Sequence, residues 1–328
     1  MPTATASDWT DLGLEVNRAL GELPLPSEPA RLYEPVRYVL AAGGKRVRPA
    51  VLLLAAEAFG GQDARDRAMS AALGIEVFHN FTLVHDDIMD HAATRRGRPT
   101  VHEKWDTATA ILVGDLMMGL ANDLVVRTEG LDPAYAQSLF YDAVARLCEG
   151  QMLDMTFEAR HDVTVDEYLS MIDRKTGALL ELALEVGALC GGASRDDSRA
   201  LRRAGKALGR AFQIQDDLLD VTALAEGWGK TVGGDLVEGK RTWLVLAARG
   251  RSETDDSGWL NDVLDGRLEV HRVSEVRDRL RAVGVLDEAA SEVRRYTLEA
   301  DDALSVLPPG APTDALRSLA HRLASRAL

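Results

Sequence analysis

The stretch MSAALGIEVFHNFTLVHDDIMD, residues 69–90, carries the strongest structural signal in the sequence. Its apolar side chains recur every three or four positions, which is the spacing of one buried helix face. These residues are Met69, Leu73, Val77, Phe81, Val84 and Ile88. The pattern predicts a long helix over about 63–90 that ends in an acidic run, His85-Asp86-Asp87-Ile88-Met89-Asp90.

Helical periodicity continues on both sides of this stretch, and we find no convincing alternating strand pattern, repeat or linker. The other expected helices cover about 8–20 (after a Ser7/Asp8 cap), 31–42, 49–59, 106–127, 133–159, 165–190, 195–220, 240–249, 257–265, 272–283, 286–305 and 313–326. The glycine-rich stretch 221–240 interrupts the pattern and is typical of a functional loop. The sequence therefore predicts one all-α domain over residues 1–328.

Composition narrows the class of protein. The 328 residues are 46 % apolar, enough for a sizeable core, and the net charge of −14 argues against nucleic acid or an anionic membrane as a partner. Two cysteines, Cys148 and Cys190, are too few for a disulfide framework and favour a cytoplasmic setting. We expect no signal peptide, and no apolar stretch of the roughly 20 residues that a transmembrane helix needs.

The acidic run at the end of the first long helix suggests a metal site. Asp86 and Asp90 are four residues apart and share one helix face, at the negative end of the helix dipole. Together with Asp87 they repel one another unless a cation is present. Oxygen ligands on such a face suit Mg²⁺, which also binds substrate phosphates. For this motif alone, a solvated acidic helix end is an equal alternative.

A second acidic run repeats the same spacing. Asp216, Asp217 and Asp220 follow an apolar helical stretch and precede a glycine-rich loop, as the first three do. Two copies in matching contexts favour metal binding over a solvated helix end.

Clusters of cations accompany these carboxylates in an otherwise acidic chain. Glycines adjoin the cations in Gly43-Gly44-Lys45-Arg46-Val47-Arg48-Pro49, which is typical of an anion site, although a loop salt bridge is the alternative. Arg95 and Arg96 follow the first acidic run, where surface ion pairs are the alternative. Further basic segments lie at 174–177 and 229–242, and each is a weak signal alone.

Taken in order, these segments resemble the trans-isoprenyl diphosphate synthase (polyprenyl synthetase) family, and most of all its short-chain geranylgeranyl diphosphate synthases. The matching segments are GGKRVRP, HNFTLVHDDIMD, RRGRPTVH, GDLMMGLA, EGQMLDM, RKTGALLE, FQIQDDLLD and GKTVGGDLVEGKRT. They span about residues 40–245, and the ordered set is highly specific. The resemblance implies one all-α domain with helices around a central cavity, usually in a homodimer.

The resemblance also implies a role for individual residues. It implies Mg²⁺, three ions with the allylic diphosphate, on the aspartates Asp86, Asp87, Asp90, Asp216, Asp217 and Asp220. It implies isopentenyl diphosphate binding by Lys45, Arg48, His79 and Arg96, although without the resemblance a hydrogen-bonded core histidine is the favoured interpretation of His79. It implies allylic diphosphate binding by Arg95, Lys175, Thr176, Gln213, Lys230 and Lys240, of which Lys175, Thr176, Gln213 and Lys230 are the catalytic candidates.

The implied reaction joins isopentenyl diphosphate to an allylic diphosphate (dimethylallyl, geranyl or farnesyl) and releases pyrophosphate. Cations would stabilise the charge that grows on the departing pyrophosphate. The carbocation left behind requires exclusion of water, for which the 221–240 loop is a candidate lid.

The product length depends on the helix face below Asp86. Phe81 lies five residues before Asp86, about 7–8 Å along the helix, while Thr82 is small and Phe78 forms a deeper floor. One aromatic at that place resembles the archaeal-type enzymes and predicts a C20 product, with C15 and C25 as alternatives. A terpene cyclase and a non-catalytic partner subunit are the rival classes, and the two complete DDxxD motifs argue against both.

Overall fold

The computed structural model describes residues 9–223, 232–251 and 258–325. The chain divides into two compact units. Unit 1 comprises Met1–Asp142, Glu181–Arg202 and Leu304–Leu319, and unit 2 comprises Ala143–Leu180, Arg203–Ala303 and Ala320–Leu328. Each unit therefore carries one of the two DDxxD motifs.

The described residues are almost entirely helical, as the sequence predicts. The first part of the chain forms α1 (Trp9–Gly21), α2 (Ala30–Leu40), α3 (Val47–Met89), α4 (Val101–Lys104), α5 (Thr107–Val126) and α6 (Pro133–Glu158). The middle forms α7 (Val165–Ile172), η1 (Asp173–Gly177), α8 (Ala178–Cys190), α9 (Arg195–Thr222), α10 (Gly234–Val237) and α11 (Trp243–Arg249). The last part forms α12 (Gly258–Leu264), η2 (Val270–Arg272), α13 (Val273–Ala282), α14 (Val285–Ala303), η3 (Leu304–Val306) and α15 (Ala311–Ser325). The cap expected at Ser7/Asp8 lies outside the described residues.

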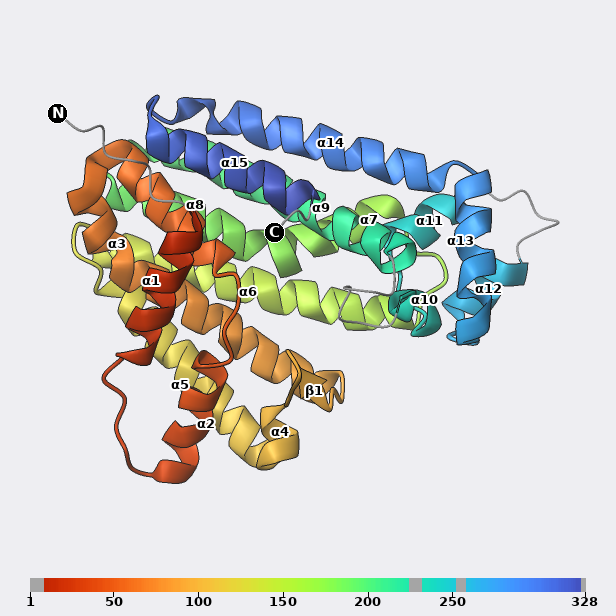
Figure 1. Ribbon diagram of the computed structural model, residues 1–328, viewed down its shortest axis with the longest axis horizontal. Coiled ribbons are helices and arrows are strands. Elements are labelled where there is room, and N and C mark those ends of the chain that lie inside the picture. Colours follow the sequence, from red (N-terminus) through yellow and green to blue (C-terminus); the bar gives the residue numbers. More distant parts are fainter. Residues whose placement is uncertain (1–8, 224–231, 252–257, 326–328) are drawn as a thin grey trace. The chain divides into compact units, whose positions relative to one another are not determined.

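Helix α3 combines two of the predicted helices. They meet at Gly61, whose φ of 69° and ψ of −168° break the helical path. Glycine adopts such a positive φ without steric cost, which explains why the junction falls there. The second half of α3 packs along α5 (Figure 1), and a Cβ atom on Gly74 would lie only 2.8 Å from the carbonyl oxygen of Ala121. Gly74 thus allows a close approach of α3 to α5.

Helix α5 requires a correction to the sequence analysis. Its 20 residues have a mean hydropathy of 1.5 over an 18-residue window, so its length and composition alone would allow it to cross a membrane. It is the one such helix among the described residues. The expectation that no apolar stretch reaches this length is therefore wrong, although the core helix of a globular protein has the same composition.

The helix predicted over 165–190 is interrupted. A π-helical turn, η1, separates α7 from α8 at Asp173–Gly177. A π-turn adds one residue to the helical repeat and is frequent at functional sites. The apolar periodicity on either side hides it from sequence analysis.

A short hairpin also departs from the prediction of no strands. Thr94–Arg95 (β1) pairs antiparallel with Arg98–Pro99 (β2), and the turn residues Arg96 and Gly97 have φ of 53° and 72°. Positive φ at both central residues is typical of the tight turn that joins two hairpin strands. Two residues per strand are too few to give an alternating pattern.

The core of unit 2 lies among α7, α9, α11, α12, α13 and α14. Its largest members include Tyr168, Trp243, Trp259 and Tyr296, all at most 5 % exposed. Each fully buried apolar side chain contributes about 1.5–3 kcal/mol, so this cluster fixes the helices that carry the second acidic motif.

Candidate active site

The glycine loop before α3 and a histidine on α3 form a cationic cluster in unit 1. The Arg48 side chain reaches His79, with 3.3 Å between Arg48 Nη1 and His79 Nε2. Burial lowers the pKa of His79 well below its usual value, and the nearby charges of Arg48 and Arg96 lower it further. His79 is therefore neutral near physiological pH and can accept a hydrogen bond from Arg48. Lys45, at the tip of the loop, is exposed.

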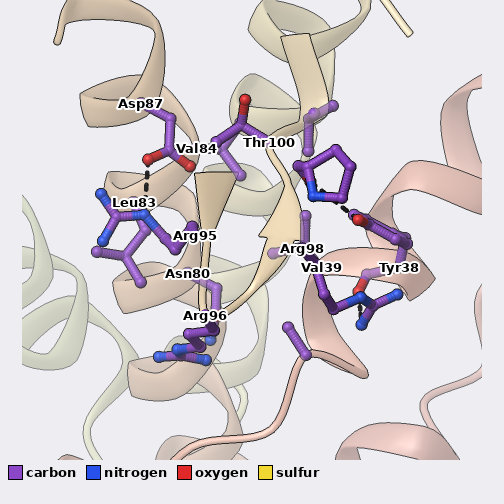
Figure 2. Close-up of a pocket in the computed structure, with 13 residues that line it drawn as sticks. Tyr38, Val39, Asn80, Leu83, Val84, Asp87, Arg95, Arg96, Arg98 and Thr100 are labelled. Carbon is purple, nitrogen blue, oxygen red and sulfur yellow. Dashed lines mark hydrogen bonds and ion pairs between the residues drawn. The ribbon is translucent and has the colours of Figure 1, made fainter. Parts of the chain in front are cut away.

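The β1–β2 hairpin brings two more cations to this cluster (Figure 2). Arg96 extends to the glycine loop and donates a hydrogen bond to the carbonyl oxygen of Gly43. Arg95 donates from Nε to Asp87 Oδ1 over 2.6 Å. Burial lowers the pKa of Arg96, and the charge of Arg46 lowers it further. Cations held this close to one another favour the binding of an anion.

Tyr38 on α2 supports the hairpin, a role that the sequence did not reveal. Its hydroxyl donates to the carbonyl oxygen of Pro99 over 2.8 Å. The Arg98 guanidinium and the Lys104 ammonium each lie 3.9 Å from the centre of its ring. Figure 2 shows Tyr38 and Arg98 beside the pocket that Arg95 and Arg96 also line. A ring in contact with two cations fixes the base of the hairpin and so its two arginines.

The first acidic motif divides into accessible and buried aspartates. Asp90 is exposed and Asp86 is half-buried. Asp87 is only 5 % exposed and is bonded to Arg95. Burial raises the pKa of Asp87, against the opposing charge of Arg95. Asp86 and Asp90 thus lie nearer the surface than Asp87, which holds the hairpin.

The candidate chain-length residues form an aromatic stack below this motif. Phe81 is 8 % exposed, and its ring stacks on Phe78 with 5.5 Å between centroids. Phe78 is fully buried and also contacts Phe140 at 5.1 Å. Thr82 donates its hydroxyl to the carbonyl oxygen of His79 over 2.8 Å. Phe81 is therefore the more exposed of the two stacked rings, and Phe78 the more deeply buried.

In unit 2 the π-turn carries Lys175 and Thr176. Arg210 on α9 fixes its first residue with two parallel bonds, Nε to Asp173 Oδ1 at 2.6 Å and Nη2 to Asp173 Oδ2 at 2.7 Å. Gly150 on α6 lets the turn approach closely, because a Cβ atom there would lie 2.4 Å from the Lys175 nitrogen. Lys175 Nζ donates to Asp154 Oδ2 over 2.5 Å. Local contacts therefore determine the position of both candidates.

Thr176 begins a chain of hydrogen bonds that leads to the second acidic motif. Its hydroxyl lies 3.3 Å from Gln213 Oε1, and Gln213 Nε2 donates to Asp217 Oδ1 over 3.3 Å. Asp217 Oδ2 accepts from the Tyr168 hydroxyl at 2.6 Å and from the Trp243 backbone N–H at 2.8 Å. Burial raises the pKa of Asp217 to about 7, although these donors favour its charged form.

The remaining candidates of unit 2 gather around α10. Asp220 is buried and accepts from the Asp235 backbone N–H over 3.2 Å. Lys240 contacts Asp235 and Glu238 at 3.1 and 2.8 Å. Burial disfavours the charge of Lys240, but these two carboxylates outweigh burial and raise its pKa. Lys230 lies outside the described residues, as does the rest of 224–231 in the candidate lid.

Metal binding by protein side chains alone is not supported. Within residues 9–223, 232–251 and 258–325, no three Asp, Glu, His or Cys side chains converge to hold an ion. Mg²⁺ commonly uses one or two carboxylates and completes its shell with water and substrate phosphates. The half-buried Asp86 and Asp216 and the exposed Asp90 have the donor chemistry that such an ion needs.

Three comparisons place the chain among known proteins. The family model described as Polyprenyl synthetase matches residues 29–280. A geranylgeranyl diphosphate synthase of Methanosarcina mazei is 40 % identical over 95 % of this chain and 94 % of its own length. A geranylfarnesyl diphosphate synthase of Natronomonas pharaonis is 38 % identical over 95 % and 94 %. The solved structure of a geranylgeranyl pyrophosphate synthetase from Pyrococcus horikoshii is 38 % identical, with a TM-score of 0.89 over 97 % of both chains.

The fold and the acidic and basic motifs define an all-α prenyl diphosphate synthase. The chain belongs to the polyprenyl synthetase family. The predicted fold class, family and reaction class are thereby confirmed.

Proposed function

We propose that the chain condenses isopentenyl diphosphate with allylic diphosphates to make mainly the C20 product, geranylgeranyl diphosphate, with release of pyrophosphate. The cationic cluster of unit 1 carries this proposal. Arg48 and His79 are half-buried near Arg96, and the buried Arg48 Nε has no hydrogen-bond partner among the described residues. Buried donors without partners are costly, so a bound diphosphate would satisfy them.

Within this cluster we assign isopentenyl diphosphate to Lys45, Arg48, His79 and Arg96. Arg48 and Arg96 supply permanent charge, and neutral His79 supplies a hydrogen bond without adding charge to a crowded site. Lys45 reaches solvent and can meet an incoming ligand first. Substrate binding here would orient the nucleophilic double bond. Such orientation removes a large part of the activation barrier of a two-substrate reaction.

The residues of the allylic site have anion-binding or dipolar chemistry. We assign Arg95, Lys175, Lys230 and Lys240 to the allylic diphosphate, and Thr176 and Gln213 to the region where positive charge develops. The Thr176–Gln213 bond orients two dipoles in advance, which lowers the reorganisation needed during reaction. The released pyrophosphate is the base that we propose for the final proton.

We propose that Mg²⁺ binds with the allylic diphosphate through Asp86, Asp90 and Asp216, with three ions as the expected number. The ions, when bound, supply Lewis-acid stabilisation of the pyrophosphate charge. Asp87, Asp217 and Asp220 are buried and accept hydrogen bonds from the protein, so their role is to position the others.

We also propose that the enzyme is a cytoplasmic homodimer that uses the apolar helix α5. Ile111 is 44 % exposed and Leu112 is 59 % exposed on this helix. A second copy of the chain would cover them, whereas a lone protomer leaves them in water at a cost. Sedimentation of wild type and of a Leu112→Glu variant tests this, because a charge in the interface should shift the dimer toward monomer. Equal masses for both proteins would contradict it.

The central experiment incubates the purified chain with isopentenyl and farnesyl diphosphates, with and without Mg²⁺. We expect elongation to C20 only when the metal is present. No elongation under either condition would contradict the enzyme proposal and favour a non-catalytic subunit. Cyclic products would favour the terpene cyclase alternative.

Product length has its own test in the aromatic stack. Phe81→Ala opens the first floor, so products should lengthen beyond C20 until Phe78 stops them. Phe157→Leu, in the core of unit 2, is the control for a general loss of packing and should leave the products unchanged. An unaltered product distribution in Phe81→Ala would show that Phe81 is not the floor. The products of the wild type distinguish C20 from the alternatives C15 and C25.

A further inference from the structure

Arg46 differs from the other cations of the glycine loop because its side chain is buried. None of the Arg46 side chain is exposed, whereas the preceding Lys45 is exposed. Its backbone lies in the left-handed region, with φ of 49° and ψ of 38°, immediately before α3 begins. A residue with a Cβ atom keeps this conformation only where its surroundings hold it. The contacts of the buried Arg46 side chain therefore determine the shape of the loop.

The partners of Arg46 come from three helices. Its Nη1 donates to Glu76 Oε1 on α3 over 2.5 Å. Its Nε donates to Asn17 Oδ1 on α1 over 2.8 Å, and its Nη2 donates to the carbonyl oxygen of Leu40, the last residue of α2, over 3.1 Å. All three nitrogens of the guanidinium thus bind protein atoms, which leaves Arg46 poorly placed to bind a substrate itself.

Glu76 is held as firmly as Arg46. Its side chain is 4 % exposed, and its Oε1 also accepts from Asn80 Nδ2 over 3.1 Å. It lies on α3 one turn before His79. A buried carboxylate on an otherwise apolar helix face is costly unless it is paired, so its presence in the sequence IEVFHN was a sign of a specific partner.

The negative charge of Glu76 also acts on the cations around it. It raises the pKa values of Arg48 and Arg96, both of which burial and the neighbouring arginines lower. Glu76 therefore offsets part of the repulsion among the arginines without contacting the anion that they would bind.

We propose that Arg46 and Glu76 form a positioning pair that sets the glycine loop, and with it Lys45 and Arg48, for the diphosphate of isopentenyl diphosphate. This inference rests on the proposed function of the same cluster. The pair is distinct from the residues that touch the ligand. It fixes the loop by joining α1, α2 and α3 at one buried guanidinium.

The test replaces the pair by apolar side chains of similar length, Arg46→Met with Glu76→Met. This double variant leaves no unpaired buried charge, so it should fold. The Kd for isopentenyl diphosphate, measured by calorimetry without an allylic substrate, should rise by about tenfold or more because the loop is no longer held. The KM for isopentenyl diphosphate should rise in parallel, while the KM for farnesyl diphosphate changes less than about twofold.

Two further variants separate positioning from folding. Glu76→Gln leaves Arg46 buried without its charge partner, so thermal stability should fall below that of the double variant. Arg65→Met breaks another largely buried ion pair of unit 1, with Glu57 and Glu15, and is the matched control. It should leave the Kd for isopentenyl diphosphate unchanged.

The outcomes distinguish this inference from the proposed function. A double variant that folds and keeps the wild-type Kd would overturn the positioning role, whatever its activity. A wild type that binds isopentenyl diphosphate but elongates nothing would contradict the proposed function. The Kd of the double variant would then still decide whether Arg46 and Glu76 position the loop. A wild type that does not bind isopentenyl diphosphate at all would overturn both.

Discussion

Asp87 and Asp217 occupy the same place in two motifs of identical spacing, yet they are held by different chemistry. Asp87 pairs with a cation, Arg95, whose side chain is 37 % exposed. Among the described residues, the donors to Asp217 are uncharged: the Tyr168 hydroxyl, the Trp243 backbone N–H and the Gln213 amide. The first motif is therefore tied to a surface hairpin by charge. The second is tied to the hydrophobic core by hydrogen bonds.

This difference predicts where each motif is vulnerable. An exposed guanidinium can turn to water when its partner is removed, so the loss is small. Buried neutral donors have no such alternative and bear the full cost of remaining unpaired. Substitution of Asp87 and of Asp217 should therefore lower the free energy of unfolding by different amounts. Substitution of Asp86 and of Asp216 should lower activity by similar amounts.

The largest expected effect tests what the motifs share. Asp86→Asn and Asp216→Asn should each lower kcat by about 100-fold to 1,000-fold, because each removes a carboxylate proposed to hold Mg²⁺ where charge develops. Both residues are half-buried, so the fold should be preserved. Steady-state elongation at saturating Mg²⁺ measures the loss, with thermal unfolding as the control. If only one variant loses activity, the two motifs do not share a function.

The second effect tests what separates the motifs. Asp217→Ala should lower the free energy of unfolding by about 3 kcal/mol, because it leaves three buried donors without an acceptor. Asp87→Ala should cost only about 1 kcal/mol, because Arg95 gains access to water. Urea denaturation of both variants beside wild type measures the difference. Equal losses would show that the nature of the partner does not matter here.

The sequence predicts the two acidic motifs and nearly every long helix. It does not predict that Asp87 and Asp217 are held by different kinds of partner. Apolar periodicity located nearly every long helix, because a buried stripe imposes its period on the chain. It missed the π-turn at Asp173–Gly177, because helix continues directly on both sides of it, and the hairpin, whose strands have two residues each. The DDxxD letters are identical in both motifs, so the roles of the buried aspartates depend on partners that only the fold brings near.

The same limit applies to the supporting residues. Tyr38 and Tyr168 are not revealed by the sequence, because each acts through a contact distant in sequence. Arg46 is expected among the anion-binding cations of the glycine loop, but it forms the salt bridge that was the alternative there. Glu76 differs from these residues, because a charged residue among buried helix positions indicates in the sequence itself that it needs a buried partner. Lys45, Arg48 and His79 were found through the family resemblance, and the structure adds that burial keeps His79 neutral.

The third effect exploits the neutral His79 of the first motif's unit. The folded-state pKa of His79 lies well below the value of about 6.5 of an unfolded chain. The unfolded chain therefore binds the proton first, and stability is lost as pH falls below about 6.5. Wild type should lose more stability than His79→Gln between about pH 7 and pH 5, measured by urea denaturation. The exposed His271→Gln is the control and should follow wild type, and parallel curves for all three would contradict the prediction.

The smallest effect isolates one bond of the second motif. Tyr168→Phe removes only the hydroxyl that donates to Asp217 Oδ2, whereas the Trp243 N–H and the Gln213 amide remain bonded. Because the carboxylate keeps two donors, the free energy of unfolding should fall by only about 1 kcal/mol. The matched variant is Tyr38→Phe, which removes the hydroxyl bond that supports the hairpin of the first motif. If the core bond is worth more than the hairpin bond, Tyr168→Phe will be the less stable of the two. The reverse order would mean that the hairpin, not the core, is the more tightly held support.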